Sequence, residues 1–184
     1  PTAPKPEPGA KSEAPDDAGL GRQVLFSMIL GTYCMGELTI GTRLVLHARR
    51  LDWSPGEAEA LLSGFFLGML AGRMFVTLVP LRLSHRGLLY ASGGLAALSA
   101  VAGLLWHPAG LAVSGLFMGP FYPTGQALLR ESFPRSFDAV MGTALVVVAG
   151  LVMATHAGVG VASDAVGLPV ALWIVPSSLV AAVI

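Results

Sequence analysis

The chain has 184 residues, of which 54% are hydrophobic and only 12% are charged, and its mean hydropathy is +0.70. A soluble domain carries roughly 25% charged residues because its surface faces water, so this composition indicates an integral membrane protein. The formal net charge is zero and there is a single cysteine, Cys34. We therefore expect no nucleic-acid partner, no disulfide framework and no metal cluster.

The first 22 residues differ in composition from everything after them. They are rich in Pro, Ala, Glu, Asp, Lys and Gly, with almost no large apolar residue. Such a segment cannot bury enough surface to offset its chain entropy, so residues 1–22 are predicted to be a flexible linker, not a signal peptide. The chain starts with Pro and is still apolar at its last residues, so we expect it to be a piece of a larger protein.

Six apolar runs follow the linker, and each is predicted to be a membrane-spanning helix. A helix needs about 20 mostly apolar residues to cross a ~30 Å hydrocarbon core, and the alternating pattern of a β-barrel is absent. The predicted spans cover residues 24–46, 58–80, 87–106, 110–129, 139–160 and 168–184. Residues 23–184 are therefore expected to form an all-α membrane domain with six transmembrane helices.

Basic residues outside the spans predict the orientation of the domain. Those on the same side as residues 1–22 are Lys5, Lys11, Arg22, Arg82, Arg86, Arg130 and Arg135. Only Arg49 and Arg50 fall on the other side. Because cytoplasmic loops carry the excess of Lys and Arg, residues 1–22 are predicted to be cytoplasmic. All three tryptophans fall near the opposite interface, where indole rings favour the headgroup region: Trp53, Trp106 and Trp173.

Two of the predicted spans contain residues that shape helix packing. Gly64, Gly68 and Gly72 recur every four residues, and such small-residue faces let two helices approach closely. Pro120 and Pro123 remove two helical hydrogen bonds, so the fourth span is predicted to kink or break inside the membrane. A broken helix at this depth indicates a transport cavity, with a kink that serves packing alone as the equal alternative.

Polar groups inside the spans are the candidate functional residues, because a charge in lipid is costly. Glu37 lies 14 residues after Gln23, or about 21 Å along the helix at ~1.5 Å per residue, near the midplane. Its carboxyl group is a candidate proton carrier, and a neutral or paired carboxyl that only packs is the alternative. His156 is a candidate proton relay or packing residue. The candidate hydrogen-bonding groups for a polar solute are Tyr33, Tyr122, Thr124 and Gln126.

Three arginines are predicted to act near the cytoplasmic side. Arg73 lies seven residues before Pro80, about 10 Å from that side, so it is expected to snorkel or to brace a cytoplasmic gate. Because Glu37 lies at a different depth, no direct ion pair between the two is expected. Arg82 and Arg86 in the following loop complete the candidate gate.

Four short motifs occur in a fixed order along the chain: Gly36-Glu37 before Gly41, Gly72-Arg73 before the basic loop 82–86, Gly119 before Tyr122-Pro123-Thr124, and the segment 160–167. This order resembles the second six-helix half of the major facilitator superfamily, in particular its fucose-permease-like sugar transporters. The resemblance implies two three-helix repeats of inverted topology, an N-terminal six-helix half as partner, and a location in the cell inner membrane.

The function expected from this resemblance is secondary active transport of a small polar solute such as a sugar, coupled to protons, by alternating access. Two alternatives stay open: a drug or metabolite exporter of the same fold, and a non-transporting membrane assembly or binding module. No enzyme activity or cofactor is expected, because the chain has no glycine-rich phosphate loop, no metal-ligand spacing and no nucleophile elbow.

Overall fold

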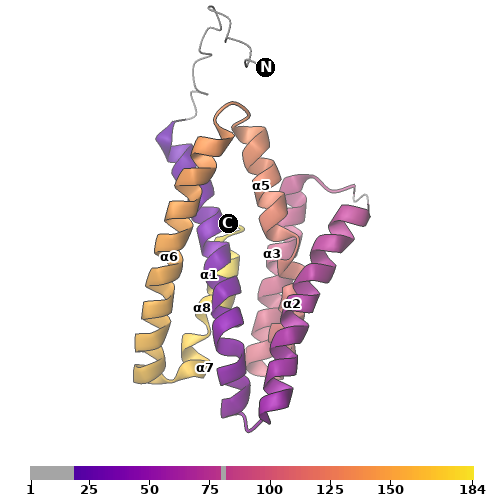
Figure 1. Ribbon diagram of the computed structural model, residues 1–184, viewed down its shortest axis with the longest axis vertical. Coiled ribbons are helices and arrows are strands. Elements are labelled where there is room, and N and C mark those ends of the chain that lie inside the picture. The colour runs from indigo at the N-terminus through magenta and orange to yellow at the C-terminus, as the bar shows by residue number, and fades with distance from the viewer. Residues whose placement is uncertain (1–18, 80–81) are drawn as a thin grey trace, which may run out of the picture.

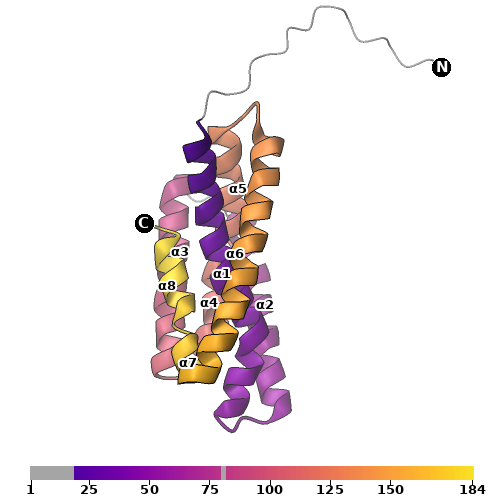
Figure 2. The same cartoon turned by 90° about the vertical axis from the view of Figure 1, so that its left-hand side faces the viewer.

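The computed structural model describes residues 19–79 and 82–184, and all regular secondary structure in these ranges is α-helical. The helical segments are α1 (Leu20–Arg50), α2 (Pro55–Leu78), α3 (His85–Leu105), α4 (Ala109–Met118), α5 (Phe121–Ser132), α6 (Phe137–Val166), α7 (Leu168–Ala171) and α8 (Ile174–Ala181). They run side by side as an elongated bundle (Figures 1 and 2). The prediction of an all-α fold is confirmed for these residues.

Four of the six predicted spans are helices long and apolar enough to cross a membrane, namely α1, α2, α3 and α6. The fourth predicted span is divided into α4 and α5 at Gly119–Pro120, where a break was predicted. The sixth is divided into α7 and α8, and residues 168–181 are shorter than the ~20 residues that a span needs. Six uninterrupted spans are therefore not found in the described residues.

Proline explains the second interruption as well as the first. Pro176 has no N–H to donate to the Leu172 carbonyl group, which would be its partner in a regular helix. The Val175 N–H donates to that carbonyl instead, at 3.0 Å, and the tighter turn separates α7 from α8. Residues Leu172 and Trp173 keep right-handed helical backbone angles, so the chain continues in the same sense across the junction.

The ends of the four long helices differ from the predicted boundaries by one to six residues. Helix α1 begins at Leu20, so residues 20–22 of the predicted linker belong to a helix, while residues 1–18 lie outside the described residues. Helix α6 continues to Val166, beyond the predicted end at residue 160, and turns only at Gly167, whose φ of 90° suits a residue without a Cβ atom. Ser54 begins α2 with a capping box to Glu57 and with Pro55 in the first turn.

The connections alternate between the two ends of the bundle. The end of α2, the start of α3 and the α5–α6 connection lie at the same end as the start of α1, and the α1–α2 connection lies at the other end (Figure 1). Arg22, Arg86 and Arg130 are thus grouped at one end, and Arg49 and Arg50 lie at the opposite end. This grouping is the one that the charge pattern predicts, and the cytoplasmic assignment remains a prediction.

The core of the bundle is formed by side chains of α1, α2, α3, α4, α5 and α8. Its fully buried large side chains include Tyr33, Phe65, Met118 and Phe121. Helix α4 packs between α2 and α3, while α1 packs against α6, α8 and α2. A second, smaller cluster of Leu129, Phe133 and Val140 fastens α5 to α6 at the arginine-rich end.

Candidate functional site

The break between α4 and α5 leaves carbonyl groups without their helical donors. In a regular helix the Leu116 carbonyl accepts from residue 120 and the Gly119 carbonyl accepts from residue 123, but both of those residues are prolines. A buried carbonyl without a partner costs roughly 1–3 kcal/mol, and lipid supplies no donor. The surroundings of these two carbonyls therefore decide whether the break is stable.

Helix α2 covers both carbonyl groups. At Gly72 the α2 backbone lies against the Leu116 carbonyl oxygen, so closely that a Cβ atom at Gly72 would collide with it. One residue later, Arg73 Nε donates a hydrogen bond of 3.3 Å to the Gly119 carbonyl oxygen. The arginine thus replaces the donor that Pro123 lacks.

The approach of α2 to α4 depends on glycines of both helices. Cβ atoms at Gly115 and Gly119 would collide with the Phe65 and Met69 carbonyl oxygens of α2. Gly68 faces the Leu116 N–H at 3.1 Å from the position of its missing Cβ atom. Gly64, which shares the four-residue spacing, has no atom of a neighbouring helix within 4 Å of that position, so it lies outside this contact.

Tyr33 of α1 also contacts the break between α4 and α5. Its ring is fully buried and stacks on Phe121, with ring centroids 4.4 Å apart and planes 5° apart. Its hydroxyl group donates a hydrogen bond of 2.8 Å to the Met118 carbonyl oxygen. In this structure the hydroxyl is therefore engaged with the backbone, and a role as a solute ligand remains a prediction.

Glu37 lies one turn after Tyr33, close to the middle of α1. Its side chain is half-buried. Tyr33 and Arg73 both donate to carbonyl groups at the helix break, so Glu37 lies one turn along α1 from a residue that contacts the break. No ion pair joins Glu37 to Arg73 in the described part of the chain.

This arrangement combines a carboxyl group with accessible hydrogen-bond donors. The Glu37 carboxyl group can hold or release a proton, and Arg73 supplies N–H donors beyond the one bound to Gly119. Arg73 is exposed on the face of α2 in this structure, so those donors are accessible. A polar solute bound beside them would accept hydrogen bonds from the guanidinium group and donate hydrogen bonds to the carboxylate.

The other predicted site residues are less closely gathered. Tyr122 and Gln126 are half-buried on α5, whereas Thr124 is only 6% exposed. His156 is half-buried on α6 and makes no hydrogen bond or ion pair within residues 19–79 and 82–184. The structure places His156 on the helix that packs against α1, but it shows no contact between His156 and Glu37.

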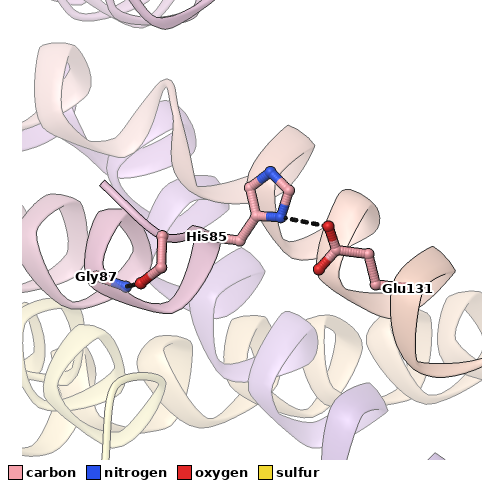
Figure 3. A network of polar contacts seen from close by, with 4 residues as sticks. His85, Gly87 and Glu131 are labelled. Atoms are coloured by element: carbon pink, nitrogen blue, oxygen red, sulfur yellow. Dashed lines mark hydrogen bonds and ion pairs between the residues drawn. The ribbon is translucent and has the colours of Figure 1, made fainter. Parts of the chain in front are cut away.

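The predicted gate arginines lie at the arginine-rich end of the bundle. Arg82 and Arg86 are exposed at the α2–α3 connection, and neither forms an ion pair among the described residues. The ion pair at this end is formed by their neighbour His85, whose Nδ1 lies 2.9 Å from Glu131 Oε1 of α5 (Figure 3). Ser84 accepts the Gly87 N–H and caps the first turn of α3.

Two features of the site were missed from the sequence. The glycine contact involves Gly115 of α4 and Gly119 directly after this helix, and their four-residue spacing was the available signal. The second feature is the pairing of Arg73 with the Gly119 carbonyl group. Pro123 marks that carbonyl as short of a donor, but a linear sequence does not show which side chain replaces it.

Comparison of the chain with protein-family models, with curated proteins and with solved structures found no match.

Proposed function

We propose that this chain is half of a secondary active transporter that moves a small polar solute, such as a sugar, together with protons. The single observation that carries the proposal is that Tyr33 and Arg73 both donate to carbonyl groups at a proline-broken helix, with Glu37 one turn after Tyr33, inside a bundle of apolar helices. Discontinuous helices and intramembrane carboxyl groups are typical of solute and proton sites in transporters.

The packing of the helices supports an arrangement of two inverted three-helix repeats. The first repeat would comprise α1, α2 and α3, and the second would comprise α4 with α5, α6, and α7 with α8. Helix α1 packs against α6 just as α4 packs against α2, and α1 packs against α8 just as α4 packs against α3. Such reciprocal contacts are expected when a two-fold axis in the membrane plane relates the repeats.

The burial of the helices supports a partner half. In the most apolar stretch of α1, 44% of the residues are buried, but the corresponding shares are 17% for α2 and 11% for α6. The exposed face of α6 carries Gly142, Gly150 and Gly158, and no neighbouring atom lies within 4 Å of where their Cβ atoms would be. Glycines on an exposed helix face permit close contact with another helix. We assign that contact to an N-terminal six-helix half.

The proposed mechanism uses the helix break as the moving contact. Protonation of Glu37 removes its negative charge, and solute binding occupies the accessible donors of Arg73. Since Arg73 also donates to the Gly119 carbonyl group, a change at the solute site acts directly on the contact between α2 and α4. Rocking of this half against its partner would then expose the solute to the other side of the membrane.

Uptake into proteoliposomes tests this proposal. The full-length protein would be assayed with a panel of radiolabelled monosaccharides under an imposed proton gradient. Glu37→Gln is expected to abolish gradient-driven accumulation, whereas the exposed Glu59→Gln on α2 is expected to retain it. Gradient-driven accumulation that survives in Glu37→Gln at the level of the control would refute the role of Glu37.

A further inference from the structure

A groove on the outside of the bundle lies apart from the site at Glu37. It has a volume of about 440 Å³ and is bounded by α2 and α3, with α4 as its floor. Its large lining side chains are Phe75 and Val76 of α2, Leu88 and Leu95 of α3, and Leu116 and Phe117 of α4. The groove exists because α2 and α3 both pack along α4, with only small side chains such as Ala71 and Ala91 between them.

The chemistry of the groove suits a hydrocarbon chain. The one hydroxyl group in its lining, that of Ser92, donates to the Leu89 carbonyl oxygen at 3.2 Å and is thereby satisfied. Phe75 is 53% exposed and Leu95 is 47% exposed, although both lie in helices apolar enough to span a membrane. An exposed apolar surface on such helices suits contact with acyl chains.

The end of the groove is basic. The α2–α3 connection joins its two walls, and this connection carries Arg82, followed by Arg86 in the first turn of α3. Both arginines are exposed. The Glu131 carboxylate at this end lies 2.9 Å from His85 Nδ1 (Figure 3). The N-terminus of α3 adds a partial positive charge at the same end.

We propose that the groove binds an anionic phospholipid, with one acyl chain between α2 and α3 and the phosphate at Arg82 and Arg86. The floor and one wall of the groove include Leu116, Pro120 and Gly72, which are also the residues of the α2 contact with the helix break. A lipid in this groove therefore supports the break from the outside. The binding itself does not depend on the proposed transport function.

Native mass spectrometry of the purified full chain tests the binding. The protein would be exchanged into phosphatidylglycerol or phosphatidylcholine with identical acyl chains, and the retained lipid would be counted. A preference for phosphatidylglycerol of about fivefold for each arginine at the phosphate is expected from the attraction of a basic side chain to an anionic headgroup. Equal retention of the two lipids by the unaltered protein would overturn the proposal.

Substitutions separate the headgroup from the acyl chain. Arg82→Gln with Arg86→Gln is expected to abolish the preference, whereas Arg49→Gln with Arg50→Gln at the opposite end is expected to leave it unchanged. Ala91→Trp, which fills the groove from an exposed position, is expected to reduce retention of both lipids, and Ala71→Trp provides the same test from the other wall. Unchanged retention in both tryptophan variants, with circular dichroism showing intact helices, would reject the groove as the binding site.

A last comparison distinguishes a bound lipid from a bound anion. Glycerol phosphate, which has the charged group without the acyl chains, is expected not to displace phosphatidylglycerol at equal concentration. Displacement by glycerol phosphate would contradict the proposal, because it would show that the arginines alone account for binding.

Discussion

Arg73 Nε donates a 3.3 Å hydrogen bond to the carbonyl oxygen of Gly119, the carbonyl group whose helical donor is removed by Pro123. This bond joins residues 46 positions apart in the chain and links α2 to the junction of α4 and α5. At the same junction, the Tyr33 hydroxyl group donates a hydrogen bond to the Met118 carbonyl oxygen. Two side chains from different helices thus stabilise a break that would otherwise leave buried backbone carbonyl groups without donors.

Replacement of Arg73 should destabilise the bundle. Arg73→Met keeps much of the side-chain length but removes the donor to Gly119, and the free energy of unfolding is expected to fall by about 1–2 kcal/mol. The measurement is the thermal unfolding midpoint in detergent, with Arg49→Met, an exposed arginine at the opposite end, as the control. Equal midpoints for the two variants would show that the bond to Gly119 contributes nothing to stability.

The contact between α2 and α4 should be sensitive to a single methyl group. Gly72→Ala places a Cβ atom against the Leu116 carbonyl oxygen and 3.1 Å from Pro120 Cδ, so we expect a loss of about 1–3 kcal/mol from overpacking. Gly64→Ala on the same helix meets no atom within 4 Å and is expected to be neutral or stabilising by up to about 1 kcal/mol. Thermal unfolding of the two variants provides the comparison, and a tolerated alanine at residue 72 would contradict the packing described here.

The hydroxyl group of Tyr33 should contribute measurably to stability. Tyr33→Phe retains the stacked ring on Phe121 but leaves the Met118 carbonyl group without its side-chain donor, with an expected cost of about 1 kcal/mol. Tyr90→Phe, whose ring is 58% exposed, should unfold at the same temperature as the unaltered protein. If the two substitutions lower the midpoint equally, the bond to Met118 is not the cause.

The ion pair between His85 and Glu131 should contribute little. The two side chains are 43% and 59% exposed, and exposed pairs typically contribute 0.2–1 kcal/mol, so the change for Glu131→Gln is expected to be below about 1 kcal/mol. Because salt screens exposed charges, the difference between the variant and the unaltered protein should shrink as ionic strength rises. A loss of several kcal/mol that persists in high salt would show that this pair is more protected than its exposure indicates.

Local sequence patterns were sufficient for the long helices. Helices α1, α2, α3 and α6 each contain an uninterrupted apolar run, and the helix break at Gly119–Pro120 follows from two prolines three residues apart. The start of α1 was not predicted, because Gly21 and Arg22 interrupt the apolar run and become helical as an extension of the span. The division between α7 and α8 follows from Pro176, which cannot donate to the Leu172 carbonyl group.

The candidate site could be predicted only in part. Glu37 was identified because an acidic residue stands out in an apolar run, and that signal is local. The hydroxyl group of Tyr33 was predicted to face a solute, but in the structure it reaches a carbonyl group 85 residues away. Likewise, the separation of Arg73 from Pro80 in the sequence gives the depth of Arg73 in a straight helix. It does not show that Arg73 donates to the Gly119 carbonyl group. Contacts of this kind depend on how helices pack, which a sequence pattern does not encode.

The most direct test of proton-coupled transport at Glu37 is solute-driven proton movement. Full-length protein in liposomes that contain a pH-sensitive dye would receive a pulse of a transported monosaccharide without any imposed gradient. We expect acidification of the lumen by the unaltered protein and none by Glu37→Gln, while Glu37→Gln still exchanges labelled for unlabelled monosaccharide. An unchanged proton signal in Glu37→Gln would contradict the assignment of Glu37 as the proton carrier.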